Sequence, residues 1–322
     1  MTPILKLVGL TAVLLLASIN TGTAQSAEGS TEQKAILVTG ASTGIGRKIT
    51  ETLAANGYFV YAGARKRKDL DSLNEIDNVQ SIRLDVTVQD EIDAAVETVR
   101  KGGRGLYGLV NNAGVAIGGP MTEVSVDELQ WLFDVNVFGV YRVSQAFAPL
   151  IIESKGRITT IGSISGILSG TFFGHYSMSK HAIEAYTDSL AGEMAHFGVQ
   201  VSVIEPGNYS SEISNSAIAR IKEKEYMQEG SPFAEQMQAL LDRPSDRKQY
   251  KEPDEVADAA LHALFDDNPY RRYMVVPNEE EAGVTIRKAV EELVQLNEYQ
   301  AYSYSREELI AMLDAAMEPA RK

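Results

Sequence analysis

Short apolar runs alternate with longer amphipathic runs between residues 35 and 276. The apolar runs have the length of buried strands and lie at residues 35–38, 59–64, 81–85, 106–112, 157–162, 199–204 and 273–276. The main amphipathic runs repeat apolar residues at the helical period and lie at residues 44–56, 89–100, 126–152, 176–197 and 253–265. Because parallel strands need helical crossovers, this order predicts an α/β fold, a doubly wound parallel sheet of about seven strands in one domain over residues 34–322.

Residues 208–251 interrupt this alternation. The stretch mixes polar residues with apolar ones such as Ile213, Ile221 and Met237, and it lies between the sixth strand and the next helix. Ligands bind beyond the carboxyl ends of the strands in such sheets, so an insertion at this point is expected to arch over the same edge. We predict a helical lid, with a surface helical insertion as the alternative.

The first 24 residues form a separate compositional block. Lys6 precedes an apolar run at residues 7–19, and small residues follow at 22–24. This pattern predicts a signal peptide or a membrane anchor, followed by a polar linker at residues 25–33. Because Lys6 precedes the run and Glu28 follows it, the positive-inside rule places the rest of the chain outside the cytoplasm. We expect an exported (periplasmic) or membrane-anchored protein, with cytoplasmic catalysis as the alternative if the segment is not a true signal.

Composition and charge exclude several classes of function. The 322 residues carry a net charge of −14, which disfavours nucleic-acid binding because phosphate contacts need clustered Lys and Arg. The chain has no cysteine, which excludes disulfides, thiolate catalysis and cysteine-ligated metals. Its four histidines have no metal-ligand spacing, and no metal site is predicted.

A glycine-rich turn, Val-Thr-Gly-Ala-Ser-Thr-Gly-Ile-Gly at residues 38–46, connects the first strand to the first helix. Glycines in such a turn let the backbone approach a diphosphate, which then lies at the helix N-terminus. An ordinary strand-to-helix turn is the alternative interpretation. The choice between them depends on the residues at the other strand ends.

Further motifs lie at or after the later strand ends, in the order Asn111-Asn112-Ala113-Gly114, Ser163, Tyr176-x-x-x-Lys180 and Pro206-Gly207. Together with the glycine-rich turn, these are five motifs in register over residues 34–277. With them the chain resembles the single-domain branch of the short-chain dehydrogenase/reductase family. The resemblance implies a Rossmann-type sheet and a nicotinamide dinucleotide cofactor. It also implies reversible hydride transfer between the nicotinamide C4 and a ketone or alcohol.

The resemblance also implies four catalytic residues. Tyr176 matches the acid/base, and Lys180 lies one helical turn away on the same face. A free tyrosine has a pKa of about 10, and a neighbouring ammonium favours the tyrosinate. Ser163 is expected to donate a hydrogen bond to the substrate oxygen. Asn136 matches the family asparagine that kinks the long helix and holds a proton-relay water.

The end of the second strand indicates which cofactor is used. It carries Arg65 and no acidic residue, and an arginine can bind a 2′-phosphate where a carboxylate would repel it. We predict NADP, with NAD as the second candidate and a basic surface loop as the alternative interpretation. The expected cofactor-binding residues are Gly40, Ser42, Thr43, Gly44, Ile45, Gly46, Arg65, Asp85, Val86, Asn112, Ala113, Gly114, Tyr176, Lys180, Pro206, Gly207 and Ser211.

The apolar residues of the lid, with Leu168, Phe172 and Phe173 just before Tyr176, predict an apolar pocket. Local resemblance to steroid and retinol dehydrogenases points to a small hydrophobic alcohol or ketone. A redox-silent NADP-binding regulatory protein is the alternative, and the glycine spacing disfavours an epimerase or dehydratase. The resemblance further implies a homodimer or homotetramer that pairs through the helices at 126–152 and 176–197. The tail, residues 283–321, is helical in pattern and is expected to shape the pocket or an interface.

Overall fold

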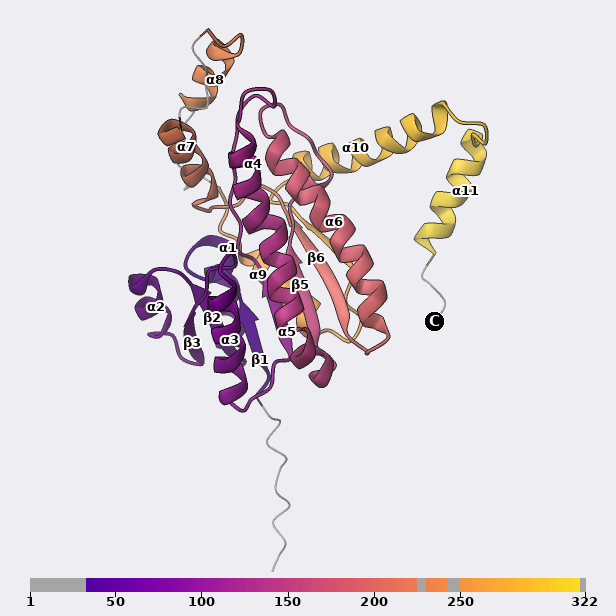
Figure 1. The fold of residues 1–322 in the computed structure, drawn as a ribbon. Helices are drawn as coiled ribbons and strands as arrows, with labels where there is room; N and C mark the ends of the chain where they lie inside the picture. Colours follow the sequence, from indigo (N-terminus) through magenta and orange to yellow (C-terminus); the bar gives the residue numbers. More distant parts are fainter. Residues whose placement is uncertain (1–32, 225–229, 243–249, 319–322) are drawn as a thin grey trace, which may run out of the picture. The chain divides into compact units, whose positions relative to one another are not determined.

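The computed structural model describes residues 33–224, 230–242 and 250–318. These residues include a sheet of seven parallel strands in the order β3-β2-β1-β4-β5-β6-β7 (Figure 1). The strands are β1 (Ala35–Val38), β2 (Phe59–Ala64), β3 (Val79–Arg83), β4 (Gly108–Asn111), β5 (Arg157–Ile161), β6 (Gln200–Pro206) and β7 (Arg272–Val275). The predicted doubly wound α/β sheet is confirmed. The leader predicted at residues 1–24 lies outside the described residues, as does most of the linker at 25–33.

Helices pack on both faces of the sheet because side chains alternate along each strand. Ile36 points to one face, where it packs in a core with α1 and α9, and Leu37 points to the other, with α3, α5 and α6. These helices are α1 (Gly44–Ala55), α3 (Gln89–Lys101), α5 (Val140–Ser154), α6 (Gly174–Ala195) and α9 (Asp254–Phe265). Both faces are therefore buried, as the continuous apolar runs of the sequence require.

The strand register brings the functional loops to one edge of the sheet. Val38, at the end of β1, is aligned with Ala62 of β2 and with Val110 of β4. Asn111, at the end of β4, is aligned with Thr160 of β5. The segments that follow these strands therefore begin side by side, at the edge where ligands bind in such sheets.

The sequence run at 126–152 is not a uniform α-helix. α4 (Val126–Phe133) and α5 are joined by the π-helical turn η1 (Asp134–Gly139), which contains Asn136. The predicted irregularity at Asn136 thus takes the form of a π-helical turn. Among the described helices, Val126–Ser154 is long and apolar enough to cross a membrane, but 44% of its apolar 18-residue stretch is buried and its Phe147 packs in the core.

The sequence does not predict α2 (Arg67–Leu73), which follows the basic end of β2. Its apolar contacts come from Leu70 and Leu73 alone, which is too few to show a helical period. Other boundaries move by a few residues: β3 begins at Val79 and β4 at Gly108, while α6 begins at Gly174 and ends at Ala195.

The predicted insertion is helical and contains α7 (Ile213–Lys224) and α8 (Ala234–Leu241). Its buried residues Ile221 and Met237 pack with Ile117 and Leu132 in a separate apolar cluster. These residues were expected to make the pocket apolar, and the packing corrects that expectation: they fix the insertion to α4 instead. The reason is that the period of a helix shows which residues share a face, and not what that face contacts.

The tail continues as α10 (Glu279–Glu298) and α11 (Arg306–Met317), so its predicted helical character is confirmed. The first turn of α10 reaches the end of β6, where the Asn208 backbone N–H donates to Glu281 Oε2 at 2.8 Å. A β-carbon on Gly207 would lie 2.2 Å from the same oxygen, so a larger residue there would displace the Glu281 carboxylate. The tail therefore helps to shape the loop after β6.

Candidate active site

A cavity of about 590 Å³ lies at the carboxyl edge of the sheet. Residues at the carboxyl ends of six strands, β1 to β6, line it. The lining begins with the glycine turn after β1 and ends at the start of α7. Seventeen predicted cofactor residues line it, and so does Ser163. Asn136 is the predicted site residue that does not line the cavity. The sequence motifs therefore converge in space, although their individual roles stay predictions.

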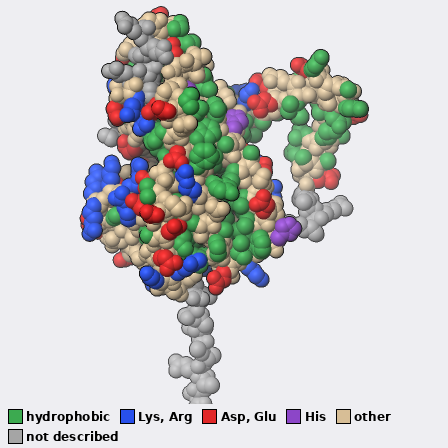
Figure 2. Space-filling model, in the orientation of Figure 1, with side chains coloured by type: hydrophobic (Ala, Val, Ile, Leu, Met, Phe, Trp, Pro, Cys, Tyr) green, Lys and Arg blue, Asp and Glu red, His purple; other side chains and the backbone are tan. Residues whose placement is uncertain are grey.

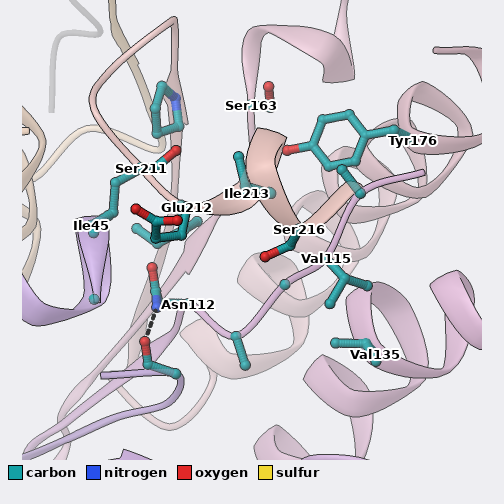
Figure 3. Close-up of a pocket in the computed structure, with 18 of the residues that line it drawn as sticks. Ile45, Asn112, Val115, Val135, Ser163, Tyr176, Ser211, Glu212, Ile213 and Ser216 are labelled. Carbon is teal, nitrogen blue, oxygen red and sulfur yellow. Dashed lines mark hydrogen bonds between the residues drawn. The ribbon is translucent and has the colours of Figure 1, made fainter. Parts of the chain in front are cut away.

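The glycine turn is held by the loop after β4. The Thr39 hydroxyl accepts hydrogen bonds at 3.0 Å from the backbone N–H groups of Asn112 and Ala113. The Asn112 amide donates in return to the carbonyl oxygens of Thr39 at 2.9 Å and Gly40 at 3.0 Å (Figure 3). These bonds fix the shape of the turn before any ligand arrives.

Two glycines of this turn are required by the contacts of the protein itself. A β-carbon on Gly46 would lie 2.3 Å from Asn112 Nδ2 and 2.4 Å from the Gly40 carbonyl oxygen. Gly40 has a φ of 64°, and its β-carbon would lie 2.8 Å from Ala113 Cα. The glycine pattern therefore serves the packing of the Asn112 loop as well as the approach of a diphosphate.

Asn136 is 1% exposed and fully engaged with its neighbours. Its side-chain oxygen accepts from the Val115 backbone N–H at 2.8 Å, and its amide donates to the Val115 carbonyl oxygen at 2.9 Å and to Ser179 Oγ at 3.0 Å. The π-helical turn thus braces the loop after β4 against α6. This bracing is a positioning contact, and the water-holding role implied by the resemblance stays a prediction.

Ser163, Tyr176 and Lys180 come together from two elements. Ser163 follows β5 and caps the short 3-10 turn η2 (Ile164–Gly166), accepting from the Ser165 backbone N–H at 3.1 Å. Tyr176 lies in the first turn of α6 and points into the cavity on the side of Ser163 and Ile213 (Figure 3). Lys180 Nζ lies 5.6 Å from the centre of the Tyr176 ring.

Lys180 is unusually well shielded from solvent for a side chain that carries an ammonium group. Its Nζ donates to the Ile161 carbonyl oxygen at 2.9 Å, and the residue is 6% exposed. Burial lowers the pKa of Lys180 to about 8, and the nearby Glu184 carboxylate opposes that shift. The lysine is therefore close to losing its charge at neutral to mildly alkaline pH.

The far end of the cavity is basic. Lys and Arg side chains gather over α2 (Figure 2). The helix begins with Arg67 and Lys68 and follows Arg65 and Lys66 in the chain. Arg65 lines the cavity, and its Nη1 lies 3.6 Å from Asp85 Oδ2. Burial alone would raise the pKa of Asp85, but hydrogen bonds from Thr87 and the Arg65 guanidinium hold that pKa below its usual value.

The start of the insertion closes the remaining side of the cavity. Ser211 lies against the glycine turn, because a β-carbon on Gly44 would be 3.3 Å from Ser211 Cβ. Glu212, Ile213 and Ser216 also line the cavity (Figure 3). The insertion itself is anchored to α4 by Arg220, which binds Glu128 through contacts of 2.6 Å and 3.0 Å.

Sequence reasoning missed several lining residues, among them Val115, Ala116, Glu212 and Ser216. The first two follow the Asn112 loop directly, and the others begin the insertion, so their places next to predicted motifs were the available signal. Glu212 matters most chemically, because it brings a carboxylate into the cavity. In the described residues no group of three or more His, Cys, Asp or Glu side chains is placed to hold a metal ion.

The residues present fit a nicotinamide dinucleotide. The backbone N–H groups of the first turn of α1 face a cavity with a glycine turn, a basic end and a serine–tyrosine–lysine end. Arg65 would hold the group at the 2′ position of the adenosine ribose, and Asp85 would hold the adenine. Lys180 would hold the hydroxyls of the nicotinamide ribose. A bound nicotinamide would supply or accept the hydride.

Comparison with known proteins agrees with this geometry. The family model described as short chain dehydrogenase matches residues 34–222. Mitochondrial D-beta-hydroxybutyrate dehydrogenase of Mus musculus is 32% identical over 265 residues, covering 74% of this chain and 76% of the relative. NADPH-dependent 3-dehydrocapnine reductase of Ornithobacterium rhinotracheale is 35% identical over 258 residues, covering 76% and 88%. Retinol dehydrogenase 7 of Mus musculus is 30% identical over 262 residues, covering 75% and 80%.

Among solved structures, a short chain dehydrogenase/reductase of Burkholderia phymatum in complex with NAD superposes with a TM-score of 0.70. It is 25% identical in sequence, and the match covers 85% of this chain and 99% of that one. The sheet order, the converging motifs and the family match lead to one conclusion. The chain belongs to the short-chain dehydrogenase/reductase family, whose members are oxidoreductases acting on alcohol and ketone groups.

Proposed function

We propose that the protein is an NADP-dependent oxidoreductase that interconverts a small hydrophobic ketone and the corresponding alcohol. The observation that carries this proposal is the convergence of Ser163, Tyr176 and Lys180 at one end of a cavity lined by a glycine turn. Each residue has a distinct task in that arrangement. Ser163 orients the substrate oxygen, Tyr176 gives or takes its proton, and the Lys180 ammonium favours the tyrosinate.

The preference for NADP is supported by charge at the adenosine end of the cavity. Arg65 follows β2 and is the basic residue that lines the cavity there, and its side chain is 60% exposed beside Asp85. A planar guanidinium binds phosphate through two parallel hydrogen bonds. The related 3-dehydrocapnine reductase is described as NADPH-dependent, while the Burkholderia phymatum structure holds NAD.

A hydrophobic substrate is supported by the lining next to Tyr176. Val115, Leu168, Phe173 and Ile213 line this part of the cavity, and Lys180 is the only cation among the described lining residues there. An apolar wall with few polar groups suits a neutral ketone or alcohol. The relatives include a retinol dehydrogenase and a hydroxybutyrate dehydrogenase, so the substrates named for them range from apolar to anionic.

We further propose that residues 1–24 direct the protein to or across a membrane. The apolar run after Lys6 supports this, and one relative is described as mitochondrial. Cell fractionation with N-terminal sequencing of the native protein tests the proposal. A soluble cytoplasmic protein that begins at Met1 would contradict it.

Initial rates with NADPH and with NADH, over a panel of steroids, retinoids, aliphatic ketones and short hydroxy acids, test the proposed function. The proposal expects a higher kcat/KM with NADPH and with apolar ketones. Activity restricted to hydroxy acids or sugars would contradict the substrate class. Tight NADP binding without turnover of any compound would instead indicate a redox-silent regulatory protein on the same fold.

A further inference from the structure

Glu184 lies on α6 one turn beyond Lys180, directly behind the turn that carries Ser163. A β-carbon on Gly162 would lie 3.1 Å from Glu184 Oε1, and one on Gly166 would lie 2.9 Å from it. Two glycines close to Ser163 therefore leave room for this carboxyl group. Its Oε1 is buried and has no hydrogen-bond partner within the described chain, which is unusual for a carboxylate.

Glu205 approaches Glu184 from β6. It shares a strand face with Val203, which packs in a cluster with Ile183, the neighbour of Glu184. Glu205 is 2% exposed, and its Oε1 also has no hydrogen-bond partner among the described atoms. Burial first, and then the charge of Glu184, raise the pKa of Glu205 to about 8 against the opposing effect of Arg272.

The charges around the two carboxyl groups come from α6 and from the start of β7. On α6 these are Lys180 at the inner end and Asp188 at the outer end, and at β7 they are Arg271 and Arg272. Arg272 lies 3.1 Å from Glu184, 2.7 Å from Asp188 and 3.6 Å from Glu205. Arg271 acts on the outer Asp188, so Lys180 and Arg272 are the cations that face the two buried carboxyl groups.

We propose that Glu184 and Glu205 form a buried carboxyl pair that shares one proton, and that its single negative charge keeps Lys180 in the ammonium form. The pair touches neither substrate nor cofactor, so these are positioning residues that act through Lys180. The role rests on the proposed function, because it matters for turnover only if Lys180 supports Tyr176. The existence of the shared proton does not depend on turnover.

The pair extends the pH range in which Lys180 is charged. Below about pH 8 the pair carries one proton and one negative charge, and Lys180 is an ammonium. As pH rises the pair gives up its proton, and the added negative charge opposes deprotonation of Lys180. When both carboxyl groups are removed, burial alone shifts the pKa of Lys180. Its ammonium group then loses its proton at a lower pH.

Infrared spectroscopy of the purified full chain tests the pair without any substrate. A buried protonated carboxyl group has a C=O stretching band that carboxylates lack. We expect this band at pH 7 in the wild type, its loss in Glu205→Gln, and its loss from the wild type above about pH 8. A wild type without the band at pH 7 overturns the proposal, whatever the activity.

The pH profile of alcohol oxidation with NADP tests the action on Lys180. In Glu184→Gln/Glu205→Gln the alkaline limb of kcat/KM is expected to move down by about one pH unit, the size of shift a lost neighbouring charge produces. Each single variant keeps one carboxyl group and should move the limb less. Asp188→Asn is the matched control: it removes an exposed carboxylate bound to the same Arg272 and should leave the limb in place.

A double variant that folds, binds NADP and keeps the wild-type alkaline limb overturns the action on Lys180. If the wild type turns over no substrate, the proposed function fails. The infrared result still decides whether the two carboxyl groups share a proton. The pH dependence of NADP affinity then replaces the rate profile, because Lys180 lines the same cavity. In that case the double variant should lose affinity at lower pH than the wild type.

Discussion

Arg65 is the single side chain on which the proposed choice of NADP depends most. Replacement by Ala removes the guanidinium at the end of β2 and leaves the backbone of the loop unchanged. Hydrogen bonds to charged groups contribute about 1.5–3 kcal/mol, so KM for NADP should rise about tenfold or more, while KM for NAD changes little. Initial-rate kinetics with both cofactors measure this.

Arg67→Ala is the matched control for that experiment. Arg67 follows in the same basic stretch, but its side chain is 87% exposed, pairs with Asp71 and does not line the cavity. It should change neither KM. Equal losses for NADP and NAD in Arg65→Ala would show that Arg65 supports the loop and does not read the phosphate.

At the scale of elements, the contact of α7 with α4 decides how the insertion closes the cavity. Arg220 donates to Glu128 through its Nε and Nη2 groups, and its guanidinium stacks 3.4 Å above the Trp131 ring. The Glu128 side chain is 12% exposed, so the pair is largely withdrawn from water. Ile213 and Ser216 line the cavity from the same helix, so loosening α7 should disturb the substrate end.

Arg220→Met should therefore raise KM for the hydrophobic substrate severalfold and lower stability by about 1–3 kcal/mol, because Glu128 is left buried without its cation. Steady-state kinetics and thermal unfolding measure the two effects. Adding Glu128→Gln should recover stability but not KM. Lys224→Met, on the exposed side of the same helix, is the control and should change neither. An unchanged KM in Arg220→Met would mean that the Arg220–Glu128 pair does not position α7.

At the scale of the whole molecule, exposed apolar residues indicate where copies of the chain associate. Phe138 in η1 and Tyr141 at the start of α5 are 52% and 55% exposed, and Met178 on α6 is 44% exposed. The tail exposes a second set, which includes Leu296 at 75% and Leu313 at 57%. The resemblance to the family favours pairing through the first set, and we propose a dimer or tetramer built on it.

Tyr141→Glu should reduce the assembly to monomers, because a charge in an apolar interface is not compensated. Leu296→Glu should leave the dimer intact. Size-exclusion chromatography with light scattering measures both masses. Dissociation by Leu296→Glu alone would place the interface on the tail helices.

Much of this molecule can be predicted from its sequence, because the sheet is built from short apolar runs that end in recognisable residues. The turn at Gly40–Gly46, the loop at Asn112 and the Tyr176–Lys180 pair are local patterns, and each lies where the strand order places it. The contacts that were not predicted join residues far apart in the chain. Examples are Arg220 with Glu128, and Glu184 with Glu205, whose partners depend on how helices pack.

The proposed function requires that Tyr176 moves a proton while a hydride passes between the nicotinamide C4 and a carbonyl carbon. The most direct test follows deuterium from NADPH that carries deuterium at both C4 positions into the alcohol formed from an apolar ketone, in the wild type and in Tyr176→Phe. We expect one deuterium on the carbinol carbon for each NADPH consumed. We also expect Tyr176→Phe to be slower by about 100-fold or more at saturating NADPH. Deuterium absent from that carbon, or an undiminished rate in Tyr176→Phe, would contradict it.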